Sequence, residues 1–382
     1  MSAVIRGETV NPHKTTAKKM ARVAVGLSHA LVVSDEQLWG CGDNSSSQLG
    51  YLSLFKRHST NMRRFKKTPP VISVCAGSNN TFFIDDQGEA WVCGCNSAGK
   101  FGIGNVLINQ FVDKPHKIPN LPPLQSIATN DQHTMFLDQE GFVWSCGNNQ
   151  LGQLGKGDYV ARNKPEKIAT LPPIQAVGCG RNISMFLDFD GNVWGTGSDP
   201  FNLTPIGRKN TRVPSMLEEM AKIKKISVAD FHTGFITVEN ELKLFGDNSW
   251  DQLGESKESC IYKAATAENN FQLPPIEDFS CFFAGSMILA KDSSLWRFGN
   301  VSFGVWAENK LAEPHPVFTE FASSLNQSIF VCEDRSLVTA GTNEFGCLGL
   351  GHTRKNPTPT FHTIPNLFVR DSHPNLKSAR TC

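Results

Sequence analysis

A glycine that follows an apolar stretch recurs seven times along this 382-residue chain, and it constrains the fold more than any other feature. The intervals between successive copies are 52, 53, 50, 49, 53 and 42 residues. Pairs of prolines ending at Pro70, Pro123, Pro173 and Pro275 keep the same period. Such repetition is the signature of an array of small units, each of which buries its apolar face against its neighbours. The seven glycines are Gly42, Gly94, Gly147, Gly197, Gly246, Gly299 and Gly341.

Each unit is predicted to consist of short β-strands. In the third unit, residues 134–137 and 142–146 are apolar runs joined by a turn that contains Gly141, which is the pattern of a β-hairpin. A Pro-Pro pair marks the start of a strand such as residues 174–177, because proline cannot donate to a strand ladder. A further extended segment around residues 164–168 brings the count to four strands. No stretch shows a helical period over three turns.

Seven units of about fifty residues with four strands each predict an all-β fold, a seven-bladed β-propeller with four antiparallel strands per blade. Radial repetition allows residues 1–382 to form a single domain, with residues 370–382 as a C-terminal tail. Residues 10–14 and 359–364 both resemble outer strands, which is one more than seven blades need. We therefore expect one end of the chain to complete the last blade and the other to lie across the seam, and the sequence does not say which.

Composition excludes several classes of protein. The 37 basic and 36 acidic residues balance, so no overall field directs the chain to nucleic acid or to a membrane. The longest apolar stretch, residues 281–290, is about half a membrane span, and residues 1–10 lack the apolar core of a signal peptide. Eleven cysteines without a secretion signal indicate free thiols in a reducing, intracellular setting, either nucleus or cytoplasm.

Covalent catalysis is not expected. The chain has no phosphate-binding Gly-Lys-Ser/Thr loop, no nucleophile elbow and no His-Glu-x-x-His motif. Cys41, Cys93 and Cys146 share one register, each just before its glycine, so metal ligands would be spread around the ring. We interpret these cysteines as small apolar core residues and expect neither a metal nor a cofactor.

The unit resembles the repeat of the regulator-of-chromosome-condensation family. That repeat reads Gly-x-x-His-Thr, then a hairpin, an aromatic-x-x-Gly strand end, and Asn-x-x-Gly-Gln-Leu-Gly. The third unit is the best copy, with His133-Thr134 followed by residues 144–147 and 148–155. The resemblance covers essentially residues 10–365, although units four and six lack Gln-Leu-Gly. A plant ultraviolet photoreceptor shares this repeat but has tryptophan two residues before the histidine, where this chain has none, so light sensing is disfavoured.

The resemblance implies guanine-nucleotide exchange on a Ran-type or related small GTPase, by a chain that acts as a monomer. Such a catalyst binds the nucleotide-free GTPase better than the loaded form and makes no covalent bond. The residues of the family's binding face lie at and just before the His-Thr pair, which here are Asp131, His133, Asp230 and His232. Residues 197–207 resemble the family's protruding β-wedge, whose candidate contacts are Ser198, Asp199, Phe201 and Asn202.

Each of these assignments has a structural alternative. A histidine repeated at one blade position usually satisfies backbone groups inside the repeat, and the wedge-like segment reads equally as a drifted blade loop. Tryptophan recurs three residues before the glycine in five units, and an identical register indicates packing. The five are Trp39, Trp91, Trp144, Trp194 and Trp296.

One local charge anomaly stands out between units one and two. Residues 56–67 contain six basic side chains and no acidic one, and we expect them on the loop between the units. They are Lys56, Arg57, Arg63, Arg64, Lys66 and Lys67. Such a patch binds DNA phosphates in chromatin or an acidic partner, and the alternative is a solvated loop.

Two functions of different classes therefore remain. The first is nucleotide exchange, which is favoured because we expect the chain to be little more than one propeller, without an appended ligase or kinase domain. The second is a non-catalytic scaffold that binds a protein partner, since a fold does not determine a function. The sequence identifies neither the GTPase nor the partner.

Overall fold

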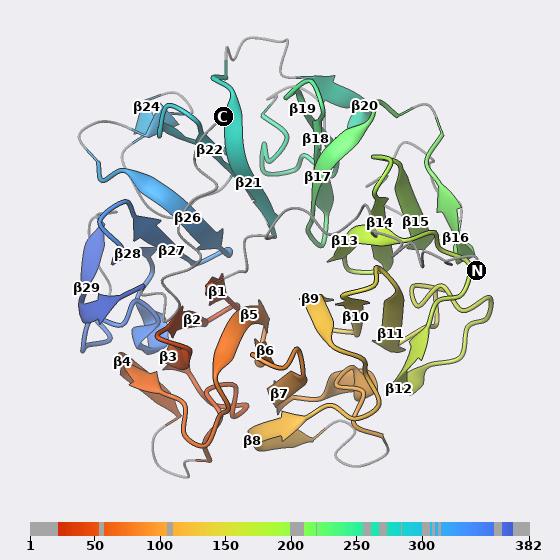
Figure 1. Ribbon diagram of the computed structural model, residues 1–382. Helices are drawn as coiled ribbons and strands as arrows, with labels where there is room; N and C mark the ends of the chain where they lie inside the picture. The colour runs from red at the N-terminus through yellow and green to blue at the C-terminus, as the bar shows by residue number, and fades with distance from the viewer. Residues whose placement is uncertain are drawn as a thin grey trace, which may run out of the picture.

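The repeated apolar hairpins fold into seven small antiparallel sheets that follow one another around a ring, as the computed structural model shows (Figure 1). The inner strands β1, β5, β9, β13, β17, β21 and β26 lie nearest the centre, and each blade continues outward. The structure describes residues 22–369 apart from 53–56, 105–109, 199–209, 219, 255–260, 267–272, 284, 300–305, 308–309, 312–314 and 355–360. The predicted seven-bladed propeller is confirmed.

The strands of each sheet are consecutive in the chain. Blade 1 comprises β1 (Val23–Val25), β2 (His29–Ser34), β3 (Gln37–Asp43) and β4 (His58–Arg64), and blade 2 comprises β5 (Val71–Gly77), β6 (Asn80–Asp85), β7 (Ala90–Cys95) and β8 (Phe111–Lys117). Blade 3 comprises β9 (Leu124–Thr129), β10 (His133–Asp138), β11 (Val143–Gly147) and β12 (Arg162–Lys167), and blade 4 comprises β13 (Ile174–Cys179), β14 (Ile183–Asp188), β15 (Val193–Gly197) and β16 (Thr211–Met216). Blade 5 comprises β17 (Ile223–Val228), β18 (His232–Thr237), β19 (Leu242–Gly246) and β20 (Ile261–Thr266). Blade 6 comprises β21 (Ile276–Phe282), β22 (Gly285–Ala290), β23 (Leu295–Gly299), β24 (Trp306–Ala307) and β25 (Lys310–Leu311). Blade 7 comprises β26 (Phe318–Ser323), β27 (Gln327–Cys332), β28 (Ser336–Gly341) and β29 (His362–Phe368).

Blade 6 departs from the four-strand pattern. Its outer part consists of the two short strands β24 and β25, so this sheet has five strands in the order β21-β22-β23-β25-β24. The only helices among the described residues are the 3-10 turns η1 (Ser97–Gly99) and η2 (Glu344–Gly346). None of the helices in this described part has the length and apolarity needed to cross a lipid bilayer.

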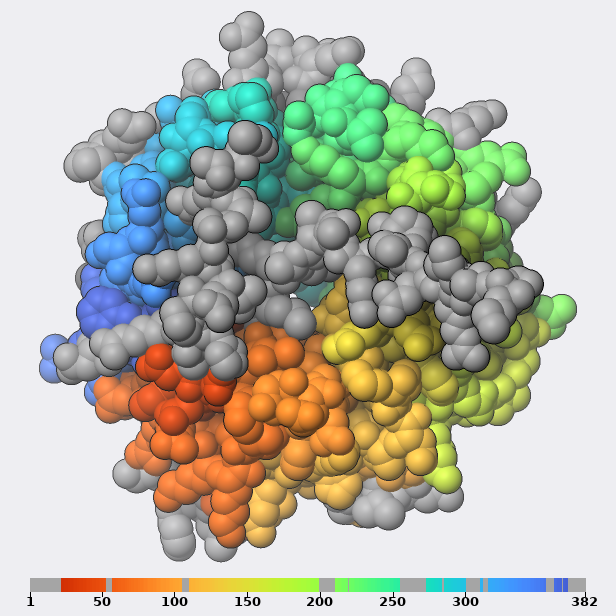
Figure 2. All heavy atoms as spheres, in the orientation of Figure 1, coloured from red at the N-terminus to blue at the C-terminus, as the bar shows by residue number. Residues whose placement is uncertain are grey.

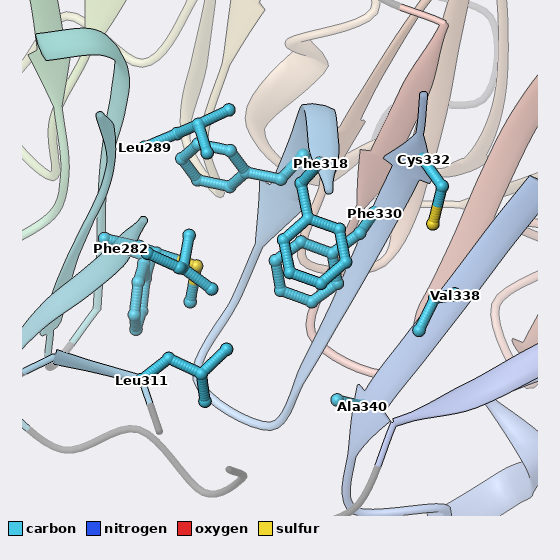
Figure 3. Close-up of a cluster of buried hydrophobic side chains, with 11 residues drawn as sticks. Phe282, Leu289, Leu311, Phe318, Phe330, Cys332, Val338 and Ala340 are labelled. Atoms are coloured by element: carbon cyan, nitrogen blue, oxygen red, sulfur yellow. The ribbon is translucent and has the colours of Figure 1, made fainter. Parts of the chain in front are cut away.

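Burial follows the position of a strand in its blade. The second strand of every blade is buried along its whole length, because it lies between two strands and between two neighbouring sheets. The core is therefore a series of clusters between blades. Figure 3 shows the cluster between blades 6 and 7, where Phe282 and Leu289 of one blade face Phe318 and Phe330 of the next. The rings of Phe318 and Phe330 have their centroids 4.5 Å apart.

The recurrent glycine ends the third strand in a conformation that other residues avoid. Gly147 has φ +109°, and a Cβ atom there would lie 2.4 Å from the carbonyl oxygen of Gln132. Glycine alone adopts this region without strain. The strand end thereby approaches the hairpin tip between the first two strands, and the amide of Asn148 donates to the Gln132 carbonyl at 2.9 Å.

The tryptophan register is explained by a hydrogen bond as well as by packing. The indole Nε1 of Trp144 donates to Asp138 Oδ2 at 3.0 Å, while Asp138 Oδ1 accepts from the amides of Glu140 and Phe142 in the turn between β10 and β11. The same arrangement joins Trp91 to Asp85 and Trp194 to Asp188. Each half-buried indole therefore closes its own hairpin.

The C-terminal strand completes the last blade. β29 pairs with β28, so the outer strand of blade 7 comes from the end of the chain, as one of the two expected arrangements required. Residues 10–14, the second expected outer strand, lie outside the described part. Figure 2 shows the first and last coloured sectors side by side in the closed ring.

The seam between blades 7 and 1 uses the same contacts as the other interfaces. The amide of Gly351 donates to the Thr60 carbonyl at 2.8 Å, as Gly104 does to Asn163 and Gly157 to Arg212 between other blades. A shared apolar cluster fills the seam. Its buried members are Val23, Val32, Ile329, Val331, Leu337, Ile364, Leu367 and Val369.

We predict that Ile364→Ala lowers the free energy of unfolding by about 2–5 kcal/mol, because it leaves a cavity in the cluster that closes the ring. Thr363→Ala on the same strand is the control, since Thr363 is exposed and we expect a change within about 0.5 kcal/mol. Urea unfolding followed by tryptophan fluorescence measures both. Equal stability of the two variants would show that the seam is not held by this cluster.

Candidate functional site

The hairpins between the first and second strands present two residues each at one face of the ring. In blade 3 the amide of Asn130 donates to the His133 carbonyl at 3.2 Å, which leaves Asp131 and Gln132 at the tip. The same closing bond occurs at Gly26, Gly180, Ala229 and Ser324. Because the first strand of each blade is the innermost, these tips lie around the axis of the ring (Figure 1). The tip residues described are Leu27, Ser28, Ser78, Asn79, Asp131, Gln132, Arg181, Asn182, Asp230, Phe231, Phe283, Leu325 and Asn326.

Asn130 holds the tip of blade 3 in place. Its Oδ1 accepts from the amides of Gln132 and His133 at 2.7 and 3.0 Å. Its Nδ2 donates to the carbonyl of Gly180, which directly precedes Arg181 in the tip of blade 4. Both sides of the Asn130 amide are thus used, and the tips carrying Asp131 and Arg181 are fixed relative to each other.

The charged tips of blades 3, 4 and 5 form an alternating row of Asp131, Arg181 and Asp230. Asp131 and Arg181 are exposed and Asp230 is half-buried. Burial raises the pKa of Asp230, the negative charge of Asp131 raises it further, and Arg181 opposes both. The two predicted carboxylates are therefore close enough to interact, and Arg181, which the sequence did not single out, lies with them.

The buried side chain of Lys100 is hydrogen-bonded to the hairpin that carries Asp131. Lys100 occupies the place that glutamine holds in the other Gly-Gln-Leu-Gly loops, and its Nζ donates to the Asn130 carbonyl at 3.1 Å. Burial lowers the pKa of Lys100 to about 8, and Asp131 counteracts that shift. The signal for Lys100 was present in the sequence as a departure from the repeat.

The structure places the predicted histidines in the scaffold. His133 and His232 are fully buried and so cannot contact a partner on the face, which corrects their assignment as binding residues. His133 Nε2 lies 2.8 Å from Ser184 Oγ in the next blade, and that hydroxyl donates to the Gln153 carbonyl at 2.8 Å. Because that hydroxyl uses its hydrogen toward Gln153, the N–H of His133 Nε2 donates the hydrogen bond to Ser184 Oγ.

The same relay joins other blades. His232 Nε2 lies 2.9 Å from Ser286 Oγ, and His29 Nε2 lies 3.3 Å from Thr81 Oγ1. Burial lowers the pKa of His29 and His232 to about 4 and that of His133 to about 3, so all three are neutral. The repeat histidine pairs buried polar groups between blades, which was the alternative interpretation.

The recurrent cysteines also serve the blade interfaces. Cys41, Cys93 and Cys146 are buried, and their thiols reach the carbonyls of Cys347, Gln48 and Lys100 at 3.2, 3.5 and 3.1 Å. Burial raises the pKa of the Cys93 and Cys146 thiols well above the usual range. The described residues contain no group of three or more histidine, cysteine, aspartate or glutamate side chains arranged to hold a metal ion.

Of the wedge-like segment, Ser198 is described and the remaining candidates are not. The amide of Ser198 donates to the Asn182 carbonyl at 2.9 Å, which ties it to the tip of blade 4. Asp199, Phe201 and Asn202 lie outside the described residues.

The basic segment lies mainly on a strand, so its expected position on a loop is wrong. β4 forms the outer edge of blade 1, where Gly40 pairs with Arg63 and Trp39 with Arg64. The strand forms because Ser59 and Phe65 are buried and Met62 packs into the seam cluster. Arg57, Arg63, Arg64, Lys66 and Lys67 are exposed, and Lys56 lies outside the described residues.

Two protein-family models match part of the repeated sequence of this chain. Residues 87–137 and 140–187 match the "Regulator of chromosome condensation (RCC1) repeat", and residues 71–100 and 125–153 match a second model of the same description.

Curated relatives carry this repeat within longer chains. Human "Probable E3 ubiquitin-protein ligase HERC6" is 33% identical over 141 residues, which are 36% of this chain and 14% of the relative. "Protein RCC2 homolog" of Xenopus laevis is 29% identical over 161 residues, 40% of this chain and 31% of the relative. The "Ultraviolet-B receptor UVR8" of Arabidopsis thaliana is 25% identical over 91% of this chain and 71% of its own length.

Solved structures share the whole architecture. Prp20p of Saccharomyces cerevisiae superposes with a TM-score of 0.74 at 21% identity, covering 90% of both chains. Human WBSCR16 superposes with a TM-score of 0.73 at 18% identity, covering 85% of this chain and 93% of its own. These similarities establish the propeller fold.

We predict that stability falls as the pH is lowered from 6.5 to 5. The buried histidines stay neutral in the folded state, whereas those of the unfolded chain take up protons below about pH 6.5. Each contributes a slope of up to about 1.4 kcal/mol per pH unit in that window. Urea unfolding at several pH values measures the slope.

The matched variant is His133→Asn, because blade 2 carries buried Asn80 at the same register. It is expected to flatten the pH dependence by about one proton, whatever its effect on stability at pH 7. An unchanged slope would contradict the assignment of His133 as a buried neutral group.

Proposed function

The chain carries RCC1 repeats in a seven-bladed propeller, and from this we propose that it acts as a guanine-nucleotide exchange factor for a Ran-type or related small GTPase. The observation that carries the proposal is the row of Asp131, Arg181 and Asp230 at the hairpin tips of blades 3, 4 and 5. The structure of Prp20p was presented with its binding properties toward Gsp1p and histones, which makes a GTPase a reasonable first partner to test here.

The proposed catalysis requires only differential binding. When a nucleotide leaves a P-loop GTPase, the lysine that held its phosphates loses its partner. Carboxylates at fixed positions favour that nucleotide-free state, and they need no rearrangement to do so. The tips meet this requirement, because Asn130 fixes the loop of Asp131 and links it to the tip of Arg181.

Half-burial suits Asp230 to such a contact. Its raised pKa means that the carboxylate is poorly solvated and lies close to a second negative charge. A cation supplied by a partner relieves both effects. The wedge-like segment, with Asp199, Phe201 and Asn202, is a further proposed contact.

The alternative function is a scaffold that binds a protein through the same face without exchange activity. A chain can keep the propeller without an exchange activity, because the contacts that join the blades, such as that between His133 and Ser184, do not involve the tip side chains. The two functions differ in a single measurable property, the release rate of GDP.

We predict that the chain accelerates release of fluorescent GDP from one member of a panel of small GTPases that includes Ran. Asp131→Ala and Asp230→Asn are each expected to reduce the acceleration about tenfold or more, because 1.4 kcal/mol of lost binding to the nucleotide-free state is a factor of ten. The control is Glu140→Ala, an exposed carboxylate in the β10–β11 turn at the opposite end of blade 3. Binding without acceleration of any GTPase supports the scaffold instead.

We propose a second role for the exposed basic side chains of β4 and of the residues on either side of it. Arg57, Arg63, Arg64, Lys66 and Lys67 line one outer edge, where they are placed to contact phosphates or an acidic protein surface. Charged side chains also protect an edge strand from pairing with other chains, so binding must be measured to establish this role.

We predict weak, salt-dependent binding of a 20-base-pair DNA duplex. The double variant Arg63→Gln with Arg64→Gln should reduce the slope of log K against log salt by about 2, one for each phosphate contact removed. Lys114→Gln on β8 is the control, because Lys114 is exposed on the outer strand of the next blade. A slope that is the same in all three proteins argues against a phosphate-binding role for β4.

A further inference from the structure

Three aromatic side chains gather on the tip face at the border of blades 5 and 6. Phe231 and Phe283 come from the hairpin tips, and Trp250 comes from the loop between β19 and β20. The ring centroids lie 4.9 Å apart for Phe231 and Phe283, 5.9 Å for Trp250 and Phe283, and 6.4 Å for Phe231 and Trp250. We call these three residues the aromatic cluster.

The aromatic cluster is exposed although it is apolar. Trp250 is 44% exposed and Phe283 is 38% exposed, while Phe231 is half-buried between them. Removing large aromatic side chains from water is favourable, and a group of exposed ones marks an interaction site. Tryptophan in particular is enriched among the residues that dominate binding energy.

The fold does not need tryptophan at position 250. In blade 1 the same register holds Ser46, and both loops make the same hydrogen bonds. The amide of Ser46 donates to Gln48 Oε1 at 3.0 Å, and that of Trp250 donates to Gln252 Oε1 at 2.9 Å.

The loops of blades 1 and 5 also share two further side-chain hydrogen bonds. Asn44 Oδ1 accepts from the Leu49 amide at 2.8 Å, and Asn248 Oδ1 accepts from the Leu253 amide at 2.9 Å. Gln48 and Gln252 each donate to the aspartate that begins the loop. The hydrogen bonds of this loop therefore form without an indole at the register of Trp250.

The tip positions of the two phenylalanines are equally permissive. The place of Phe283 holds Ser78 in blade 2 and Arg181 in blade 4, and the place of Phe231 holds Gln132 in blade 3. The register of Trp250 also holds Ala98, Leu151 and Phe345 in other blades, and that of Phe283 also holds Leu27 and Leu325, so neither position requires one particular kind of side chain. The backbone of the tips and loops therefore does not by itself require three aromatic rings at this border.

The surrounding charges indicate what kind of partner fits. Asp230 adjoins Phe231, the exposed Asp251 adjoins Trp250, and Asp131 lies close enough to Asp230 to affect its ionisation. The guanidinium of Arg181, which lies 5.5 Å from the Phe231 ring centroid, offsets one of these three negative charges. The aromatic face therefore already accepts one cation, and net negative charge remains beside it.

We propose that the aromatic cluster is the anchor of a docking site for a protein segment that carries lysine or arginine next to a large apolar side chain. The apolar side chain packs on Trp250 and Phe283, and the cation is placed between the ring faces and the carboxylates of Asp230 and Asp251. This inference concerns the surface alone and does not depend on nucleotide exchange.

The test uses a displayed library of random 12-residue peptides selected on the full-length protein. Selected peptides are expected to carry lysine or arginine within two residues of a large apolar residue. Their affinity, measured by fluorescence anisotropy, should fall at least tenfold in Trp250→Ser and in Phe283→Ser, which copy the residues of blades 1 and 2. Replacing the basic residue of a peptide by glutamine should also weaken binding to the wild-type protein.

The matched control is Phe345→Ser. Phe345 stands at the same register as Trp250 in blade 7 and is 46% exposed, but it lies outside the aromatic cluster. Affinity should be unchanged in this variant, and thermal unfolding should show all three variants folded.

Other outcomes overturn the proposal. Selection of acidic peptides, or affinities that are the same in Trp250→Ser and the wild type, would reject the docking site. Sedimentation velocity decides whether a second copy of the chain is the occupant: a wild-type dimer that Trp250→Ser converts to monomer would replace the proposed segment with a self-association interface. Failure of the GDP release assay leaves these results unaffected.

Discussion

The ring depends on the pairing of buried polar groups between neighbouring blades. At three interfaces a hydroxyl accepts a hydrogen bond from the histidine of the preceding blade and donates one to a glutamine carbonyl, as Thr81, Ser184 and Ser286 do. Elsewhere Gln327 Nε2 donates to the His29 carbonyl at 2.7 Å across the seam. A buried polar group left unpaired costs about 1–3 kcal/mol, so these contacts specify how each blade meets the next.

This scaffold separates structural residues from residues that can vary. The three repeat histidines and the loop asparagines of blades 1, 2, 3, 5 and 7 are buried and hydrogen-bonded through their side chains, whereas the hairpin tips are joined to the scaffold through backbone carbonyls such as that of Gln132. Chemistry at the tips can therefore change from blade to blade without cost to the ring. Asp131, Arg181, Asp230 and Phe283 are four such substitutions at one register.

Sequence reasoning grouped Asp131 with His133 as candidate face residues and left a scaffold role for the histidine open, and the hairpin geometry separates the two. His133 and Asp131 are two residues apart, but the hairpin turns one inward to Ser184 and leaves the other exposed. The basic segment was misplaced because its charges obscured the buried Ser59 and Phe65, which make it an edge strand. The aromatic cluster joins residues 231, 250 and 283, and no local pattern connects them.

The sequence by itself determined the number of blades, the four-strand pattern that six of them follow and the glycines that end the third strands, because these features repeat from unit to unit along the chain. Tertiary structure alone decided which terminus completes the last blade, that Arg181 lies between two carboxylates, and that three aromatic rings meet at one border. Residues in neighbouring blades are about fifty positions apart, and their contacts exist only once the ring has closed.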